Sequence, residues 1–314
     1  MQPLVSTPQP LVIAILGPTG SGKTSLALDM AQLFDGELVG CDSVQIYRHF
    51  DLGSAKTPPS ERRGIPHHLI DVVDPDQIFT AGEYTRAGRA VLAEITSRGK
   101  LPVVVGGTGF YLRALLEGLF PEPVRDEGLR DRLGRIEAQR LGFLHRLLRR
   151  LDKSAADRIH PNDSKKLIRA IEVSLLGRKP MTEQFEAGRD PLTGYRVLKI
   201  GLAPPRGLLN QRLDERVERM FESGLIGEVR NILALGYPPS AKPFESLGYK
   251  EALAVVEGRM PPKEALAAAQ LATRQYAKRQ MTWFRREKNV MWFEGFGEDS
   301  GVKANAIALV KRGI

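Results

Sequence analysis

The feature that most constrains this chain is a glycine-rich turn between a predicted strand and a predicted helix. Leu11–Leu16 is a short continuous apolar run, which predicts a buried strand, and a helix is expected over 22–34. The turn matches the P-loop pattern, in which backbone N–H groups, a helix N-terminus and a lysine surround phosphate oxygens. The residues predicted to hold a diphosphate are Gly17, Pro18, Thr19, Gly20, Ser21, Gly22, Lys23 and Thr24.

This motif leaves the phosphate compound open. Nucleotide kinases, ATPases and GTPases use the same cradle, so a bound diphosphate is all that it predicts. Thr24 can offer its hydroxyl to Mg²⁺. The alternative is a strand-to-helix turn that holds no ligand.

Alternating strands and helices predict an α/β fold with a parallel sheet flanked by helices around the P-loop. Further strands are expected over 37–41, 101–105 and 195–202. Thr80 and Glu83 have the spacing of a capping box, which begins a helix running to about residue 97.

From residue 121 the pattern changes to Arg-rich helices and then to a loop rich in glycine and proline, which predicts an inserted all-helical lobe. Two long helices are expected near the C-terminus, over 206–222 with Gly224 as the C-cap, and over 262–287. The predicted domains are a flexible leader (1–10), a catalytic core (11–120 and 195–314) and the insert (121–194).

The net charge of +9 is distributed unevenly. Residues 1–120 hold 10 Lys and Arg against 12 Asp and Glu, which leaves 36 against 25 for the remainder. A basic second part favours a polyanionic partner, with nucleic acid the first candidate. A solvated, Arg-rich helical surface is the alternative.

The composition also indicates the cellular compartment in which this chain is expected. Cys41 is the single cysteine, so no internal disulfide can form, which fits a reducing cytoplasm. The longest apolar run is Leu11–Leu16, far short of the roughly 20 residues that cross a bilayer. We therefore expect a cytoplasmic protein that is neither secreted nor membrane-spanning. We also expect a monomer.

Polar side chains follow two of the predicted strands, at the sheet edge where open parallel sheets bind ligands. Asp42 follows one strand and can act as a general base, and the Gln45 amide can pair with a base edge. As alternatives, Asp42 caps the next helix or holds Mg²⁺ through water. Thr108 follows the other strand as a substrate contact or a helix N-cap. His67 and His68 lack further metal-ligand partners and are expected to be structural or loop residues.

Taken in order, these motifs resemble the bacterial tRNA dimethylallyltransferase family from about residue 11 to about residue 293. The first half contributes Gly17–Thr24, Asp42–Tyr47, Gly53–Lys56, Pro66–Asp71 and Val105–Leu112. The second half contributes Arg158–Asp163, Arg169–Glu172, Leu247–Lys250 and Thr273–Arg285, the last being the most specific.

The resemblance implies a P-loop core whose inserted lobe grips the anticodon arm of tRNA. It implies transfer of a dimethylallyl group from dimethylallyl diphosphate, with Mg²⁺, to N6 of the adenosine 3′-adjacent to the anticodon (position 37). Asp42 would be the catalytic base. The residues that would contact tRNA are Asp42, Ser43, Val44, Gln45, Thr108, Arg130, Lys165, Lys166, Arg169, Lys250, Arg274, Lys278 and Arg279.

Two departures from the family pattern concern the insert and the segment before Gly248. Asp163–Lys166 reads Asp-Ser-Lys-Lys where relatives often have arginine, and Phe244–Leu247 precedes Gly248 where some relatives carry a basic residue. No zinc is expected, because the sequence lacks a C-terminal zinc-finger extension.

The helix expected over 262–287 has a basic face, because Arg274, Lys278 and Arg285 recur at helical spacing. This face can track a phosphate backbone, or it is a solvated basic face.

Two other functions remain open from the sequence alone. A P-loop kinase for a small molecule or nucleotide shares the cradle and an aspartate after the next strand, but gives the basic insert no role. A nucleotide-dependent RNA-binding protein without transferase activity explains the basic surface but not the predicted base.

Overall fold

The computed structural model describes residues 9–119, 125–186 and 188–313. Most of the predicted leader, residues 1–8, therefore lies outside the described residues. The chain divides into two compact units, which we call the core unit (residues up to Leu115 and from Thr193) and the inserted unit (Leu116–Leu192). The boundaries predicted from the sequence were 121 and 194.

The core unit is built on one six-stranded sheet in which every pair of neighbouring strands is parallel. This confirms the predicted α/β class. All the strands therefore end at one edge, where their connecting loops can meet. The order across the sheet is β3 (His67–His68), β2 (Gly36–Gly40), β4 (Leu101–Val105), β1 (Leu11–Leu16), β5 (Arg196–Leu202) and β6 (Val290–Phe293).

The two strands that the sequence did not predict, β3 and β6, lie at the two sides of the sheet. β3 is only two residues long and is made of histidines, so it has no apolar run. β6 follows soon after a helix that was predicted to extend to residue 287 but ends at Phe284. His67 and His68, expected as structural or loop residues, are thus sheet residues.

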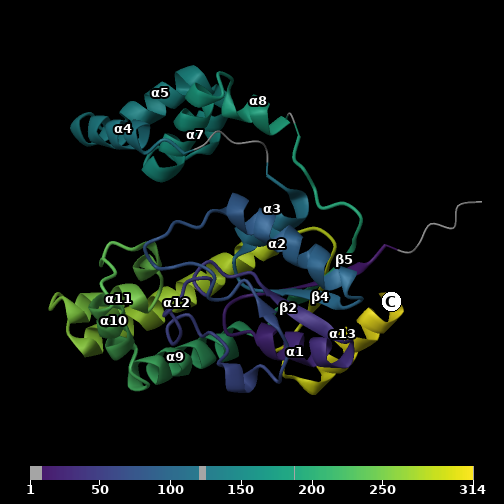
Figure 1. Cartoon of the computed structure of the whole chain (residues 1–314). Helices are drawn as coiled ribbons and strands as arrows, with labels where there is room; N and C mark the ends of the chain where they lie inside the picture. Colours follow the sequence, from purple (N-terminus) through teal and green to yellow (C-terminus); the bar gives the residue numbers. More distant parts are fainter. Residues whose placement is uncertain (1–8, 120–124, 187, 314) are drawn as a thin grey trace, which may run out of the picture. The chain divides into compact units, whose positions relative to one another are not determined.

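Helices cover both faces of this sheet (Figure 1). α1 (Lys23–Leu33) and α13 (Ser300–Gly313) lie on one side, and α2 (Ala81–Ser97) and α3 (Gly109–Glu117) on the other. Burying each large aliphatic side chain stabilises the fold by about 1.5–3 kcal/mol. The buried residues that pack together where α1 and α13 meet the sheet include Ile13, Ile15, Leu26, Met30, Leu38, Val103, Ile200 and Val302.

Local sequence signals place several helix boundaries. Thr80 Oγ1 accepts a hydrogen bond from Glu83 N, and Glu83 Oε2 accepts one from Thr80 N, so the predicted capping box begins α2. α9 spans Arg206–Glu222 as predicted, but its C-cap is Ser223. Gly224 follows with φ 99°, a left-handed conformation that glycine adopts without strain.

A second group of helices extends from the carboxyl edge of the sheet. It consists of α9, α10 (Leu225–Ala234), α11 (Tyr249–Val256), α12 (Pro262–Phe284) and the short 3₁₀ turn η2 (Lys242–Glu245), while another 3₁₀ turn, η1 (Pro59–Glu61), precedes β3. Phe50 packs edge-on against Phe244 and beside Tyr249, which joins this group to the loop after β2. None of the helices in the described ranges is long and apolar enough to span a membrane.

The described residues of the inserted unit form helices joined by turns and loops, with no strand among them. Its core includes Leu133, Leu144, Leu148, Leu167 and Ile171. The helices are α4 (Glu127–Gln139), α5 (Phe143–Leu151), α6 (Lys153–Arg158), α7 (Ser164–Leu176) and α8 (Met181–Glu186).

A buried carboxylate joins two helices of the inserted unit. Glu172, whose side chain is 0% exposed, accepts hydrogen bonds from Arg130 Nε and Nη2 and from Arg169 Nη1. It also accepts one from Asp126 N. Arg130 and Arg169 were predicted to contact RNA, but in this structure their guanidinium groups hold Glu172, because a buried carboxylate needs partners.

We expect Glu172→Gln to destabilise the inserted unit by about 3 kcal/mol, because it leaves two guanidinium groups around a neutral side chain. Burial raises the pKa of Glu172, but the hydrogen bonds from Arg130 and Arg169 outweigh it and lower the pKa to about 2. Since the folded pKa lies below the unfolded value, the stabilisation is complete above about pH 5 and disappears as pH falls toward 2.

Thermal unfolding followed by circular dichroism at pH 7 and pH 3 measures this effect. Asp131→Asn, which removes an exposed carboxylate from α4, serves as the control. Equal stability of the Glu172 and Asp131 variants at pH 7 would contradict the assigned role.

Candidate active site

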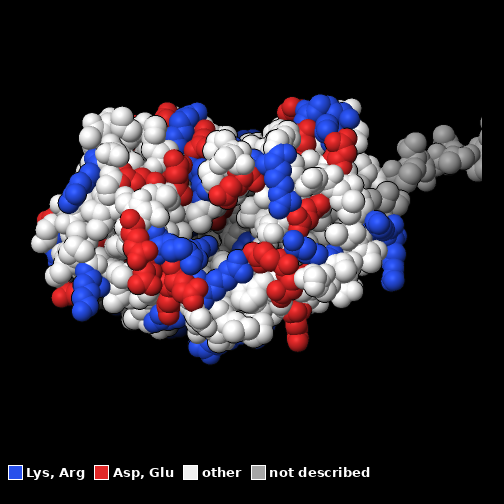
Figure 2. All heavy atoms as spheres, turned by 90° about the horizontal axis from the view of Figure 1, so that it is seen from below, with Lys and Arg blue, Asp and Glu red and all other residues white. Residues whose placement is uncertain are grey.

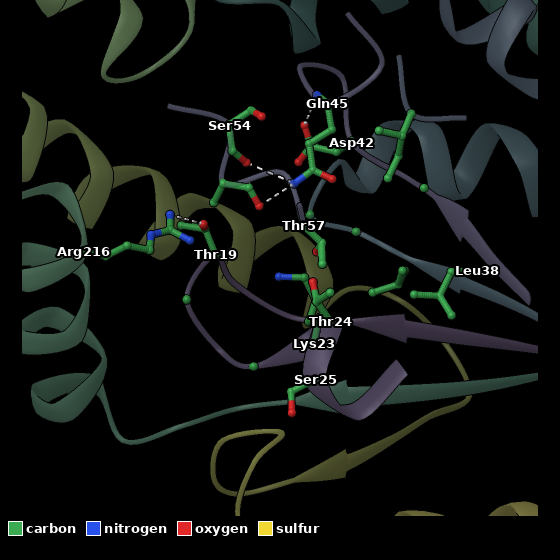
Figure 3. Close-up of a pocket in the computed structure, with 18 of the residues that line it drawn as sticks. Thr19, Lys23, Thr24, Ser25, Leu38, Asp42, Gln45, Ser54, Thr57 and Arg216 are labelled. Carbon is green, nitrogen blue, oxygen red and sulfur yellow. Dashed lines mark hydrogen bonds between the residues drawn. The ribbon is translucent and has the colours of Figure 1, made fainter. Parts of the chain in front are cut away.

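The P-loop forms the floor of a cavity of about 270 Å³ in the core unit (Figure 3). Gly20 and Gly22 have φ of 78° and 82°, so the turn uses the left-handed conformations open to glycine. Lys23 Nζ donates to Pro18 O at 2.7 Å. The hydroxyl of Ser21 is buried without a hydrogen-bond partner among the described residues, and Thr24 lines the cavity. This cradle has the donors that a phosphate group requires.

Lys23 has an unusual protonation equilibrium. Burial, together with the neighbouring positive charge of Arg216, lowers the pKa of Lys23 to about 7. A bound anion would favour the charged form and raise that pKa again.

Two residues that the sequence analysis missed hold the P-loop in place. Gln280 of α12 accepts a hydrogen bond from Thr19 N at 2.8 Å and donates one to Gly107 O at 2.8 Å, which ties the P-loop to the loop after β4. Arg216 of α9 donates to Thr19 Oγ1 at 2.7 Å. Burial, and then the charge of Arg212, lowers the pKa of Arg216 to about 10, so this side chain stays charged at neutral pH.

Arg216 belongs to a set of three arginines on one face of α9. Arg212, Arg216 and Arg219 all line the cavity. Their spacing of four and three residues within a predicted helix was the sequence signal that could have identified them. Arg212 also pairs with Glu298, which follows β6 at the same sheet edge, at 2.7 Å. Figure 2 shows a hollow on the face seen from below, with both basic and acidic side chains around it.

Asp42 lies directly across the cavity from the P-loop (Figure 3). Its Oδ1 accepts hydrogen bonds from Val44 N at 2.8 Å and Gln45 N at 3.2 Å. Residues 43–46 form a turn and no helix begins there, so the alternative of a helix cap is wrong; Asp42 caps this turn instead, with only one of its oxygens. The carboxylate still lines the cavity, so capping and general-base chemistry are compatible.

The other residues predicted after β2 are held by their neighbours. Thr108 Oγ1 accepts a hydrogen bond from Ser43 N at 3.0 Å, so Thr108 positions the segment that carries Asp42. Gln45 Nε2 donates to Ser54 O at 3.0 Å and Ala55 O at 3.3 Å. Its amide N–H groups are therefore used within the protein in this structure, and its position on the cavity wall is fixed.

The loop that receives Gln45 is itself anchored to the second group of helices. Glu228 of α10 accepts hydrogen bonds from Leu52 N at 2.8 Å and from Tyr249 OH. Tyr249 OH in turn accepts one from Gly53 N at 3.1 Å. A side chain at Gly53 would meet the Tyr249 ring at 2.5 Å, so the close approach requires glycine.

A second cavity, of about 100 Å³, meets the first at Asp42. Both cavities are lined by Thr19, Asp42, Ser54, Arg216 and Tyr276. Its remaining wall includes the apolar side chains of Val44, Val217, Met220, Leu225 and Leu247 and the polar side chains of Ser43, Ser246 and Thr273. An anion cradle and a pocket with aliphatic and aromatic side chains thus share one carboxylate.

The predicted basic face of α12 is only partly available for contact with RNA. Arg274 pairs with Asp214 of α9, whereas Lys278 and Arg279 are exposed beside Trp283 in a groove of about 370 Å³. Lys250 is exposed and lines neither of the two cavities. In the inserted unit, Lys165 and Lys166 are exposed, and Lys166 pairs with Asp163 at 2.5 Å.

Comparison with known proteins agrees with this geometry. The sequence profile of the IPP transferase family matches residues 45–287. The chain belongs to the IPP transferase family. A tRNA dimethylallyltransferase of Solibacter usitatus is similar to it, with 56% identity over 301 residues, or 96% of this chain and 98% of that protein. One of Koribacter versatilis is 54% identical, with the same coverage of both chains.

Solved structures of family members have the same fold. The full-length tRNA isopentenylpyrophosphate transferase of Bacillus halodurans is similar with a TM-score of 0.71 and 35% identity, covering 97% of this chain and 96% of that one. A eukaryotic dimethylallyltransferase acting on tRNA is similar with a TM-score of 0.81 and 28% identity, covering 96% and 79%. These findings favour the predicted transferase over the kinase alternative.

The low pKa of Lys23 predicts that anion binding weakens as pH rises. Sulfate has no titratable proton in this range, so its dissociation constant should rise about tenfold between pH 6 and pH 8 as free Lys23 loses its proton. Calorimetric titration at several pH values measures the change. Lys23→Arg keeps its charge, so its affinity should stay level, and the same slope in both proteins would contradict the assignment.

Proposed function

We propose that this chain transfers a dimethylallyl group from dimethylallyl diphosphate to N6 of the adenosine 3′-adjacent to the anticodon (position 37) in tRNAs. The observation that carries the proposal is the meeting of two cavities at Asp42. One has the cradle for a diphosphate, and the other has an apolar, aromatic wall suited to a base. Membership of the IPP transferase family supports the same reaction.

The reaction needs one bond to break and one to form. The C1–O bond of the donor breaks with its electron pair going to the diphosphate, while the N6 lone pair forms a bond to C1. N6 then loses a proton, which the Asp42 carboxylate accepts. Lys23, Arg216 and the P-loop N–H groups stabilise the charge that develops on the leaving diphosphate.

The residues of the cradle also fit a magnesium ion. Thr24 is exposed toward the cavity, and its hydroxyl would serve as a ligand together with donor phosphate oxygens. The ion would supply further neutralisation of the leaving group. Within the described residues there is no cluster of three acidic, histidine or cysteine side chains that could hold a metal by itself.

Adenosine must leave its stack to reach Asp42. Extruding a base costs a few kcal/mol, and less in a loop such as the anticodon loop. Tyr276 and the aliphatic wall of the second cavity can offset that cost by packing against the base. We further propose that the chain acts as a monomer in the cytoplasm.

The direct test is incubation with Mg²⁺, radiolabelled dimethylallyl diphosphate and unmodified tRNA that has adenosine next to its anticodon. We expect label in the tRNA, and none with Lys23→Ala. A parallel reaction with ATP and no prenyl donor tests the kinase alternative. ATP turnover without label transfer would overturn the proposal.

Asp42→Asn should lower kcat by a factor of about 10²–10⁴, because the amide cannot accept the N6 proton. Asparagine keeps the oxygen that caps Val44 N and Gln45 N, so tRNA affinity should change less than about threefold. Single-turnover rates and filter binding measure the two effects. Asp76→Asn, at an exposed position, is the control, and a rate close to wild type in Asp42→Asn would remove the base assignment.

The exposed pair on α12 should contribute to RNA affinity through counterion release. Lys278→Ala with Arg279→Ala should lower tRNA affinity and reduce the slope of log K against log salt by up to about 1.8. A control double variant, Lys263→Ala with Lys311→Ala, removes the same charge from other exposed positions. If both double variants lose affinity equally, the groove beside Trp283 has no specific role.

A further inference from the structure

The first cavity has an aliphatic end that the phosphate chemistry does not use. Leu38, Ile70 and Val105, the three branched aliphatic side chains that line it in the described chain, come from β2, the segment after β3 and the end of β4. Figure 3 places Leu38 and Arg216 on opposite sides of the cavity, with Lys23 and Thr24 between them. We call Leu38, Gly40, Ile70 and Val105 the aliphatic wall.

The strand register places three of these residues on one face of the sheet. Leu38 and Gly40 are two residues apart on β2 and therefore face the same way. Val105 pairs with Gly40, and His67 pairs with Leu38, so both lie on the same face as their partners. The wall is a continuous patch at the carboxyl ends of three adjacent strands.

The absence of a side chain at Gly40 leaves space at this end of the cavity. A side chain there would meet His68 O and Leu69 O at 3.2 Å and Ile70 Cγ1 at 3.3 Å. The space above Gly40 is therefore bounded directly by Ile70, and any larger residue would occupy it.

Ile70 is held rigidly although its side chain is half-buried. Its neighbours Leu69 and Asp71 have φ of 59° and 58°. Asp71 N donates to Gln45 O at 3.2 Å, and Asp71 Oδ1 accepts from Lys56 Nζ at 2.6 Å. Leu69 is buried, with 7% of its surface exposed. The chain on both sides of Ile70 is thus fixed, so its side chain is a defined boundary of the cavity rather than a mobile cover.

The polar neighbours of the wall are compatible with a hydrocarbon. His67 Nδ1 lies 2.8 Å from Ile65 O, and because a carbonyl oxygen only accepts, that nitrogen is the donor. Burial lowers the pKa of His67 below its usual value, so the ring carries no charge at neutral pH. The charged residues Arg212, Arg216, Arg219 and Glu298 line the cavity from the other side, after β6 and on α9.

We propose that the aliphatic wall receives the hydrocarbon tail of the prenyl donor and that Ile70 limits its length to five carbons. This inference rests on the proposed function. A second isoprene unit adds five carbon atoms beyond the end of the five-carbon tail. The Ile70 side chain bounds the cavity at this end, where its Cγ1 would lie 3.3 Å from a side chain added at Gly40. A ten-carbon tail that enters along the aliphatic wall therefore meets Ile70.

Replacing Ile70 tests the proposal through a gain of activity, which a loss of stability cannot produce. Ile70→Ala removes three carbons from a half-exposed position and opens the end of the cavity toward solvent. The ratio of kcat/KM for geranyl diphosphate to kcat/KM for dimethylallyl diphosphate, with the same tRNA, should rise at least tenfold. Mass spectrometry of the digested tRNA identifies the ten-carbon product.

Ile65→Ala is the matched control. Ile65 is the same residue type, is also half-buried and lies in the same segment, but it does not line the cavity. Its selectivity ratio should equal that of the wild type. An unchanged ratio in Ile70→Ala, or the same increase in Ile65→Ala, would overturn the proposal.

Gly40→Ala tests the wall in the opposite direction. The added methyl group fills the space in front of Ile70, so KM for dimethylallyl diphosphate should rise at least fivefold while the inhibition constant of inorganic diphosphate stays within twofold. Equal changes in both constants would place the tail elsewhere.

If the wild type transfers no prenyl group to tRNA, the proposed function fails. If it transfers five carbons and these variants keep its selectivity, only the wall assignment fails.

Discussion

The site depends on the hydrogen bonding of three adjacent parallel strands, β1, β4 and β2. Their carboxyl ends meet at one edge, so the P-loop, the Asp42 segment and the Gly106–Gly107 loop begin side by side. Cys41 N donates to Val105 O at 2.8 Å, and a side chain on Gly106 would meet Cys41 O at 2.0 Å. This contact leaves no room between the two loops. Gln280 then ties the Gly106–Gly107 loop to the P-loop through Thr19 N and Gly107 O, so a helix near the C-terminus fixes the cradle.

The same edge explains how one carboxylate can serve two substrates. Asp42 is fixed by backbone N–H groups on one of its oxygens, and Thr108 holds the next residue, so the orientation of the base does not depend on a ligand. Such a preorganised group costs little reorganisation when charge moves in the reaction. Around it the cavity walls differ in character: arginines from α9 on one side, aliphatic strand residues on another, and Tyr276 between the two cavities.

The sequence predicted the parts of this arrangement that arise from local patterns. Four strands, the helix after the P-loop and the capping box at Thr80 follow from apolar periodicity and short-range hydrogen bonds. The sequence did not predict β3, because a two-residue strand has no periodicity. It did not predict β6, because that strand follows closely on a helix. Helical spacing could have shown that Arg216 shares a face with Arg212 and Arg219. The contacts that Arg216 and Gln280 make with Thr19 could not be predicted, because they span 197 and 261 residues and no local pattern records them.

The basic residues differ in the partners that their side chains have within the protein. The family resemblance implies RNA contacts for Arg130, Arg169 and Arg274, and each of them pairs with a carboxylate of its own unit in this structure. A guanidinium that satisfies a buried carboxylate such as Glu172 cannot leave it without exposing that charge to a low-dielectric interior, at a cost of several kcal/mol. Exposed cations such as Lys278 and Arg279 pay no such cost when they approach a phosphate. Burial of Glu172, which the sequence does not reveal, therefore favours a structural role for Arg130 and Arg169, whereas the Asp214 partner of Arg274 is 35% exposed.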